Sequence, residues 1–82
     1  MHLALSAYPN PSTGAFTLGY AAQAGVGELE VWDMSGRLVL RERLPAWSQV
    51  HRVALDSEAA GMYQCQLTWG AQRTTIRILI EP

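Results

Sequence analysis

The segment Pro9–Gly14 reads Pro-Asn-Pro-Ser-Thr-Gly, and it decides how the chain on either side of it can fold. Each proline holds φ at about −65° and lacks a backbone N–H, so the segment cannot pair on both sides as a central strand does. The prolines also move Tyr8 and Asn10 out of the helical region, and Gly14 permits a positive φ where the next strand begins. The sequence therefore predicts a rigid corner near the start of a β-domain.

Short segments with alternating apolar residues lie on both sides of this corner. Phe16, Leu18 and Tyr20 recur with the period of two that puts side chains on one face of a strand. Turn residues separate the segments, and no stretch has a helical period long enough to compete. The pattern predicts an all-β fold, an antiparallel β-sandwich of about seven strands. The predicted strands span residues 3–8, 15–20, 28–32, 37–44, 50–55, 62–69 and 72–80.

Alternation also assigns the two faces of each strand. Leu29 and Val31 are expected to point into the core, whereas Glu28 and Glu30 face solvent. Trp32 shares the face of the glutamates and is the best candidate for an exposed aromatic residue. In the other strands the residues expected to point inward are Leu38, Leu40, Leu44, Tyr63, Cys65, Leu67, Trp69, Thr74, Ile76, Ile78 and Ile80. Those expected on the outer face of the same strands are Val39, Arg41, Arg43, Arg73, Thr75 and Arg77.

Two connections are predicted to be hairpin turns. Asp33 begins the sequence Asp-Met-Ser-Gly, in which its side chain can accept bonds from backbone amides and Gly36 can adopt the left-handed conformation. The stronger hairpin joins the last two strands through Gly70 and Ala71. Residues 21–27 are expected to form a flexible connection, and residues 56–61 a loop or a single helical turn capped by Asp56.

Composition limits the classes to which the protein can belong. Its 82 residues make one domain, residues 1–82, with little room for a catalytic cleft. Hydrophobic residues make up 49% and charged residues 16%, which favours a packed core over disorder. The net charge is −1 and the six basic residues, all arginine, form no cluster, so no nucleic acid and no polybasic membrane contact is predicted.

Targeting signals and disulfides are not visible in these residues. Neither a signal peptide nor a run of about 20 apolar residues is present, so the chain taken alone is expected to be soluble and cytoplasmic. As a fragment of a longer protein, it would have its targeting signal elsewhere. Cys65 is the only cysteine, which excludes an internal disulfide but leaves the redox compartment open. The oligomeric state is also open.

Residues capable of chemistry are few and scattered, so no catalytic, cofactor-binding or metal site is predicted. His2 and His51 are far apart in sequence and are expected to face solvent. Cys65 lies on the apolar face of its strand and is interpreted as a small buried hydrophobic residue rather than a nucleophile. The acidic residues considered for calcium, which lack an alternating acidic loop and are assigned to turns or caps, are Asp33, Asp56 and Glu58.

Three motifs follow one another along the chain and together resemble a known family. They are the segment Tyr8–Phe16 with its Pro-Asn-Pro corner, the segment Leu29–Val39 with an Asp-x-x-Gly-Arg turn, and Gly61–Tyr63 followed by the final hairpin. Over residues 8–80 the chain resembles the C-terminal sorting domain of the type IX secretion system, also called the Por secretion system. The motif and turn residues that carry the resemblance are Pro9, Asn10, Pro11, Gly14, Asp33, Gly36, Arg37, Gly61, Tyr63 and Gly70.

The resemblance implies an immunoglobulin-like sandwich at the end of a larger exported protein of Bacteroidetes, serving as an address and not as an enzyme. Such a protein crosses the periplasm, passes the outer membrane through the type IX translocon and its shuttle components, and often loses this domain to a sortase at the cell surface. In the family the last strand carries the main part of the signal and usually ends with lysines. The residues predicted for recognition on that strand are Arg73, Arg77, Ile78 and Ile80.

The mode of recognition and two rival functions follow from the same residues. An edge strand near the C-terminus could be extended by a partner, with Arg73 and Arg77 selecting that partner by charge. An accessory carbohydrate-binding or adhesive sandwich of a secreted hydrolase is the alternative, because Trp32 and Trp47 could stack on sugar rings while Trp69 is assigned to the core. A purely structural spacer is the third reading.

Overall fold

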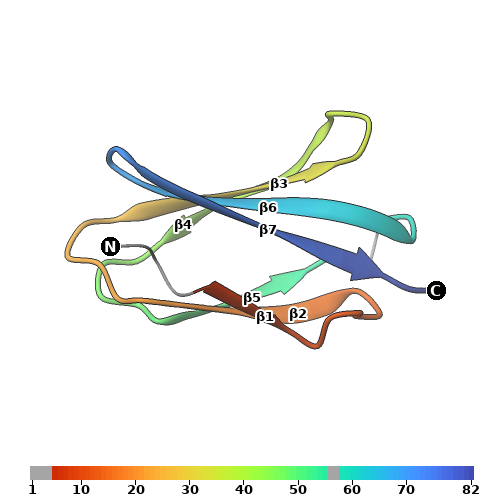
Figure 1. Ribbon diagram of the computed structural model, residues 1–82, viewed down its shortest axis with the longest axis horizontal. Coiled ribbons are helices and arrows are strands. Elements are labelled where there is room, and N and C mark those ends of the chain that lie inside the picture. Colours follow the sequence, from red (N-terminus) through yellow and green to blue (C-terminus); the bar gives the residue numbers. More distant parts are fainter. Residues whose placement is uncertain (1–4, 56–57) are drawn as a thin grey trace.

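Seven β-strands make up the protein in the computed structural model, which describes residues 5–55 and 58–82 (Figure 1). Six of them begin and end within one residue of the predicted spans. Leu3 and Ala4 of the first predicted strand, and the Asp56 cap, lie outside the described residues. The strands are β1 (Leu5–Tyr8), β2 (Ala15–Tyr20), β3 (Gly27–Asp33), β4 (Leu38–Leu44), β5 (Val50–Ala54), β6 (Gly61–Trp69) and β7 (Gln72–Ile80).

The strands form two antiparallel sheets that pack face to face. One sheet has the order β1-β2-β5 and the other the order β4-β3-β6-β7, and Figure 1 shows the larger sheet above the smaller one. The longest pairing joins β6 to β7, from Gly61 opposite Ile80 to Trp69 opposite Gln72. This arrangement confirms the predicted all-β sandwich.

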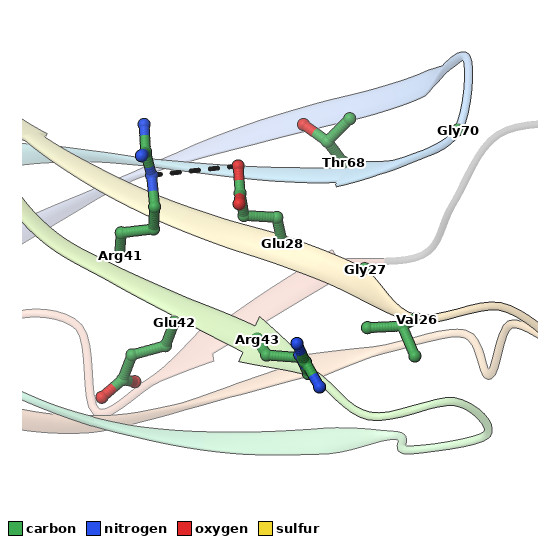
Figure 2. A pocket seen from close by; sticks show the side chains of 8 residues that line it. All are labelled: Val26, Gly27, Glu28, Arg41, Glu42, Arg43, Thr68 and Gly70. Carbon is green, nitrogen blue, oxygen red and sulfur yellow. Dashed lines mark ion pairs between the residues drawn. The ribbon is translucent and has the colours of Figure 1, made fainter.

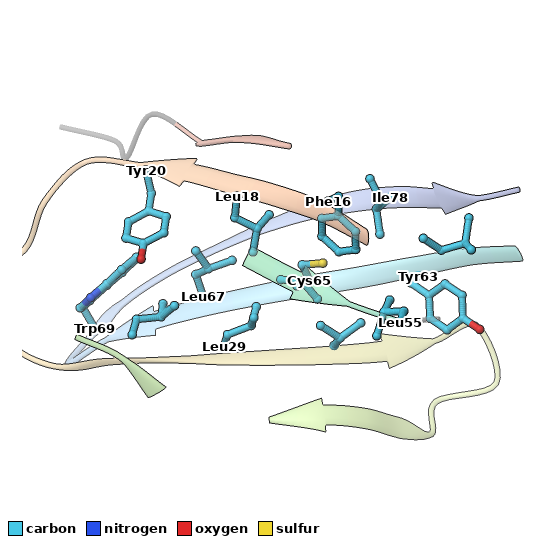
Figure 3. Close-up of a cluster of buried hydrophobic side chains, with 14 residues drawn as sticks. Phe16, Leu18, Tyr20, Leu29, Leu55, Tyr63, Cys65, Leu67, Trp69 and Ile78 are labelled. Carbon is cyan, nitrogen blue, oxygen red and sulfur yellow. The ribbon is translucent and has the colours of Figure 1, made fainter. Parts of the chain in front are cut away.

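The core lies between the inner faces of the two sheets (Figure 3). The period of two places the apolar residues of β2, β3 and β6 on those faces, as the sequence predicts. Burying each large aliphatic or aromatic side chain contributes about 1.5–3 kcal/mol to stability. The buried side chains are Phe16, Leu18, Tyr20, Leu29, Val31, Leu44, Val53, Leu55, Tyr63, Cys65, Leu67, Trp69, Ile78 and Ile80.

The predicted faces of β4 need correction at two residues, Leu38 and Val39. The register of β3 and β4 shifts between Val31 and Trp32, so that Val31 lies opposite Leu40 whereas Trp32 lies opposite Leu38. One residue of β4, Val39, is therefore extra to the ladder, as in a β-bulge. Both Val39 and Leu40 are partly buried against the core, so Val39 does not share the solvent face of the arginines. Leu38, predicted to point inward, lies opposite Trp32 and is not among the residues packed on the core.

The segment before β3 ends in the core and is more than a flexible connection. Gly27 is the first residue of β3 and is buried, and a Cβ atom at this position would lie 2.6 Å from Cδ1 of Trp69. The indole of Trp69 thus packs directly on the Gly27 backbone. Its other neighbour is Tyr20, whose ring centroid lies 5.3 Å away at an interplanar angle of 47°. The Tyr20 hydroxyl in turn lies 2.7 Å from Oγ of Ser48.

Candidate recognition surface

The Pro9–Gly14 corner turns out of β1 and docks on the end of β7. Ser12 forms a parallel bridge with Ile80, in which the Ser12 N–H donates to the Leu79 carbonyl at 2.9 Å and the Glu81 N–H donates to the Ser12 carbonyl at 2.7 Å. The Ser12 side chain is buried, and its hydroxyl donates to the Ala15 carbonyl at 2.8 Å and accepts from the Gly14 N–H at 3.1 Å. Gly14 has φ 136°, which confirms the predicted positive φ.

Asn10 extends this docking with its side chain. Its Nδ2 donates to the Arg77 carbonyl, and its Oδ1 accepts from the Leu79 N–H, both at 3.1 Å. The side-chain amide thereby takes the place of a backbone peptide unit beside β7. The peptide bonds that precede Pro9 and Pro11 are both cis. Through Asn10 and Ser12 the corner bonds along the end of β7 as well as turning the chain, a role that spacing alone did not indicate.

The Asp33 side chain organises the turn between β3 and β4. Its Oδ1 accepts from the Ser35 N–H at 3.0 Å, the Ser35 hydroxyl at 2.7 Å and the Arg37 N–H at 2.9 Å, and Oδ2 accepts from Nε of Arg37 at 3.1 Å. These bonds, with that from the Ser35 hydroxyl the largest contribution, lower the pKa of Asp33 to about 2. Gly36 has φ 91°, so the predicted hairpin turn is confirmed.

Arg37 and Tyr63 connect this turn to the start of β6. Nη2 of Arg37 lies 3.0 Å from Oε1 of Glu58, and the hydrogen bond to Glu58 is the main reason that the pKa of Arg37 is raised. Tyr63 lies opposite Asp33 in the sheet, and its hydroxyl donates to the Ala59 carbonyl at 2.5 Å. Burial raises the pKa of Tyr63.

All three sequence motifs meet at one end of the sandwich, which we call the motif end. Gly61 lies opposite Ile80, Ile80 lies beside Ser12, and Asp33 lies opposite Tyr63, so the corner, the hairpin turn and the start of β6 are neighbours (Figure 1). Gly70, which makes the β6–β7 turn with φ 56°, lies at the opposite end. The first two motifs are separated from the third by much of the chain, and only the fold brings them together.

Comparison with known protein families identifies the family to which the sequence motifs point. A family model described as the secretion system C-terminal sorting domain matches residues 6–81. The chain belongs to this family. A search of curated proteins finds no match. The protein is thus a C-terminal sorting signal for type IX secretion, which confirms the function that the motifs predict.

The sorting-domain family is not catalytic, and it implies export across the cell envelope. Bacteroidetes and a cell-surface destination fit the family. No helix among the described residues is both long and apolar enough to cross a membrane.

The residues predicted for recognition fall into two groups in the folded sorting domain. Arg73 and Arg77 are exposed on the outer face of β7. Ile78 and Ile80 have exposed fractions of 0% and 3%, because alternation turns them toward the opposite sheet. Their side chains anchor β7 in the core, so of the four predicted residues only the two arginines are exposed.

Other chemically capable residues have structural surroundings. His51 does not simply face solvent as expected; it is partly buried, and its Nε2 lies 2.8 Å from Oε1 of Glu42. Burial raises the pKa of Cys65 to about 12, which fits an unreactive core thiol. His2 and Asp56 lie outside the described residues. Within residues 5–55 and 58–82, no group of three histidine, cysteine or acidic side chains could hold a metal ion.

The three tryptophans do not form a row on the surface. Trp69 is buried, as predicted. Trp32, which lies near the motif end of β3, is only half buried rather than exposed. Trp47 is 69% exposed and lies in the β4–β5 connection at the opposite end. Two rings at opposite ends of the domain cannot stack on one short sugar chain, so the geometry does not support the carbohydrate-binding alternative.

A shallow polar groove of about 560 Å³ runs over the outer face of the large sheet near Gly70 (Figure 2). One ion pair joins two of its lining residues, with Nε of Arg41 3.9 Å from Oε1 of Glu28. Outside the groove, Nη2 of Arg41 lies 2.6 Å from Oε2 of Glu30, and this hydrogen bond is the main reason that the pKa of Arg41 is raised. Cross-strand ion pairs of this kind are typical of an exposed sheet face.

Proposed function

We propose that the sorting domain is the last domain of a larger exported protein and acts as a folded address for it. In this proposal the cargo passes through the periplasm, the type IX translocon and its shuttle components read the folded domain, and a surface sortase removes it. The cargo then reaches the cell surface or the medium. The domain itself has no enzymatic activity in this scheme.

The observation that carries the proposal is the way β7 is held. Ile78 and Ile80 fix the strand in the core, the corner docks along its end, and Arg73 and Arg77 are presented on its outer face. Rigid presentation lowers the entropic cost of binding, because the strand and its neighbours are already ordered before a partner arrives. The strand that carries the main part of the signal in the family is thus a fixed, charged surface element here.

A fusion experiment tests the sorting role. The 82 residues are placed behind a periplasmic reporter that has its own N-terminal signal peptide, in a bacterium with a working type IX system. We expect the reporter at the cell surface or in the medium. The same reporter without the domain, and the full fusion in a strain that lacks the translocon, serve as controls. A full fusion that stays in the periplasm would refute the assignment.

Truncation and tryptophan variants sharpen this test. Removal of residues 77–82 should abolish export, but it also deletes two core isoleucines and therefore lowers stability. Trp32→Ala and Trp47→Ala should export normally and bind no glycan, whereas saturable glycan binding that these changes abolish would favour the accessory-module alternative.

A further inference from the structure

The free edge of β7 is divided into an occupied part and an open part. β7 is the last strand of the larger sheet, and within the described residues its only strand partner is β6. The corner covers its C-terminal part, where the Arg77 carbonyl, both Leu79 backbone groups and the Glu81 N–H all bond to Asn10 or Ser12. The edge is thus closed from the carbonyl of Arg77 onward.

The open part lies immediately before that point. Backbone groups of alternate residues in a strand point to the same side, so the N–H and C=O of Arg73 and Thr75 point to the same side as those of Leu79, away from β6. Among the described residues no strand pairs with this side of Arg73 and Thr75, and both residues are exposed. Unpaired groups of this kind are the template on which another chain can add a strand.

The open part is also positively charged. Arg73, Thr75 and Arg77 share the outer face, where they lie opposite Thr68, Gln66 and Gln64 of β6, all uncharged. In the described part of the chain no acidic side chain forms an ion pair with Arg73 or Arg77. The two guanidinium groups start from backbone positions about 13 Å apart along the strand, at about 3.3 Å per residue.

We propose that the open edge from Arg73 to Arg77 binds an extended acidic segment of a protein partner as an added β-strand. The inference rests on the proposed sorting role, since the partner is a component that reads the domain. Backbone bonds to Arg73 and Thr75 would supply affinity, and carboxylates at the first and fifth positions of the added strand would face Arg73 and Arg77. Asn10 and Ser12 occupy the continuation of the edge, so they would stop the added strand at Arg77 and set its register.

A second copy of this domain is disfavoured at the same edge when the two β7 strands pair about Thr75. Antiparallel pairing of two copies about Thr75 would place Arg73 of each copy opposite Arg77 of the other, and like charges directly opposite one another destabilise a strand pair. The charge pattern therefore favours a different chain, one with acidic residues four positions apart.

Substitution of Thr75 separates edge pairing from folding. Thr75→Pro removes an N–H that points away from β6, so the β6–β7 ladder can remain intact, while the matched control Thr75→Val keeps that N–H. In the reporter fusion we expect Thr75→Pro to reduce export by about tenfold or more and Thr75→Val to leave it within about twofold. Circular dichroism of the purified domain verifies that each variant folds. A Thr75→Pro domain that folds and is exported as well as the parent domain would refute the proposal that a partner adds a strand at this edge.

Charge reversal tests the chemistry of the partner. Arg73→Glu with Arg77→Glu changes two exposed side chains and should leave the unfolding temperature unchanged while export falls by about tenfold or more. Normal export of this double variant would refute the proposal of an acidic partner. If Thr75→Pro failed to fold, the export of the double variant alone would test the proposal. Failure of the unaltered fusion to export would instead refute the sorting role itself.

A peptide titration gives a readout that does not depend on export. The peptide Glu-Val-Thr-Val-Glu, followed by amide chemical shifts of the domain, should perturb Arg73, Thr75 and Arg77 more than a matched peptide with lysines in place of the glutamates. Equal perturbation by the two peptides, or shifts confined to other strands, would overturn the proposed acidic strand.

Discussion

Replacement of Gly27 by alanine should destabilise the domain far more than its small size suggests. A Cβ atom at this position would lie 2.6 Å from both Cδ1 and Cε2 of Trp69, closer than carbon atoms can approach. Trp69 is 7% exposed and is held from the other side by Tyr20, so its indole cannot retreat without losing its own packing. Introducing extra atoms into a packed core costs about 1–3 kcal/mol.

Loss of the Tyr20–Trp69 ring contact adds to this cost. A favourable aromatic pair contributes about 0.5–1.5 kcal/mol beyond its buried area. The sum outweighs the roughly 0.5–1 kcal/mol that alanine gains over glycine within a strand. We expect a net loss of about 1–4 kcal/mol, which lowers the unfolding temperature of a domain of this size by about 4–30 °C. Thermal and urea unfolding followed by tryptophan fluorescence and circular dichroism measure it.

Gly25→Ala is the matched control, because nothing lies within 4 Å of a Cβ atom at that position. It should change stability by less than about 1 kcal/mol and in the stabilising direction. In a Trp69→Leu background, Gly27→Ala should cost much less, since the clash partner is gone. A Gly27→Ala domain as stable as the Gly25→Ala domain, or equal costs in both backgrounds, would refute the packing argument.

The remaining predictions concern the Asp33 turn, the corner and the end of β7. The folded-state pKa of Asp33, about 2, lies below its ordinary value of 3.8. The stabilisation by the ionised Asp33 carboxylate is therefore complete above pH 4 and disappears as the pH falls toward 2. The difference in unfolding free energy between the parent domain and Asp33→Asn, measured by urea unfolding, should shrink over that range. Asn10→Ala removes two exposed hydrogen bonds and should lower the unfolding free energy by about 1–2 kcal/mol. Amide hydrogen exchange should become faster at Leu79 and stay unchanged in β6, and unchanged exchange at Leu79 would contradict the docking role of Asn10. Ile78→Ala should lower the unfolding free energy by about 2–5 kcal/mol and Ile78→Val by about 1 kcal/mol. The Ile78→Val domain should still be exported in the reporter fusion, and a stable but export-deficient Ile78→Val domain would indicate direct recognition of that side chain.

The strands and the core could be predicted because they depend on local pattern. In β2, β6 and β7 the apolar residues alternate, so only one choice of inward face buries them. A shift of the pairing by one residue would expose all of these apolar side chains. The Asp33 turn could be predicted for a similar reason, since the carboxylate bonds only to residues within the turn. The bulge that turns Val39 toward the core could not, because it depends on the pairing of β3 with β4.

The docking of the corner on β7 and the packing at Trp69 depend on contacts between residues distant in sequence. The motifs were visible as separate segments, and the family match confirms the family that they indicate. No local pattern shows that the Asn10 side chain bonds to the Arg77 carbonyl or that Trp69 packs on Gly27. These contacts arise when the corner reaches the edge of the other sheet and when two sheets close over one core. Short-range alternation and turn chemistry were enough to predict the strands, the faces of all strands except β4, and the family. Which part of the β7 edge stays open could not be predicted, because backbone groups become paired or free only when the strands are placed side by side.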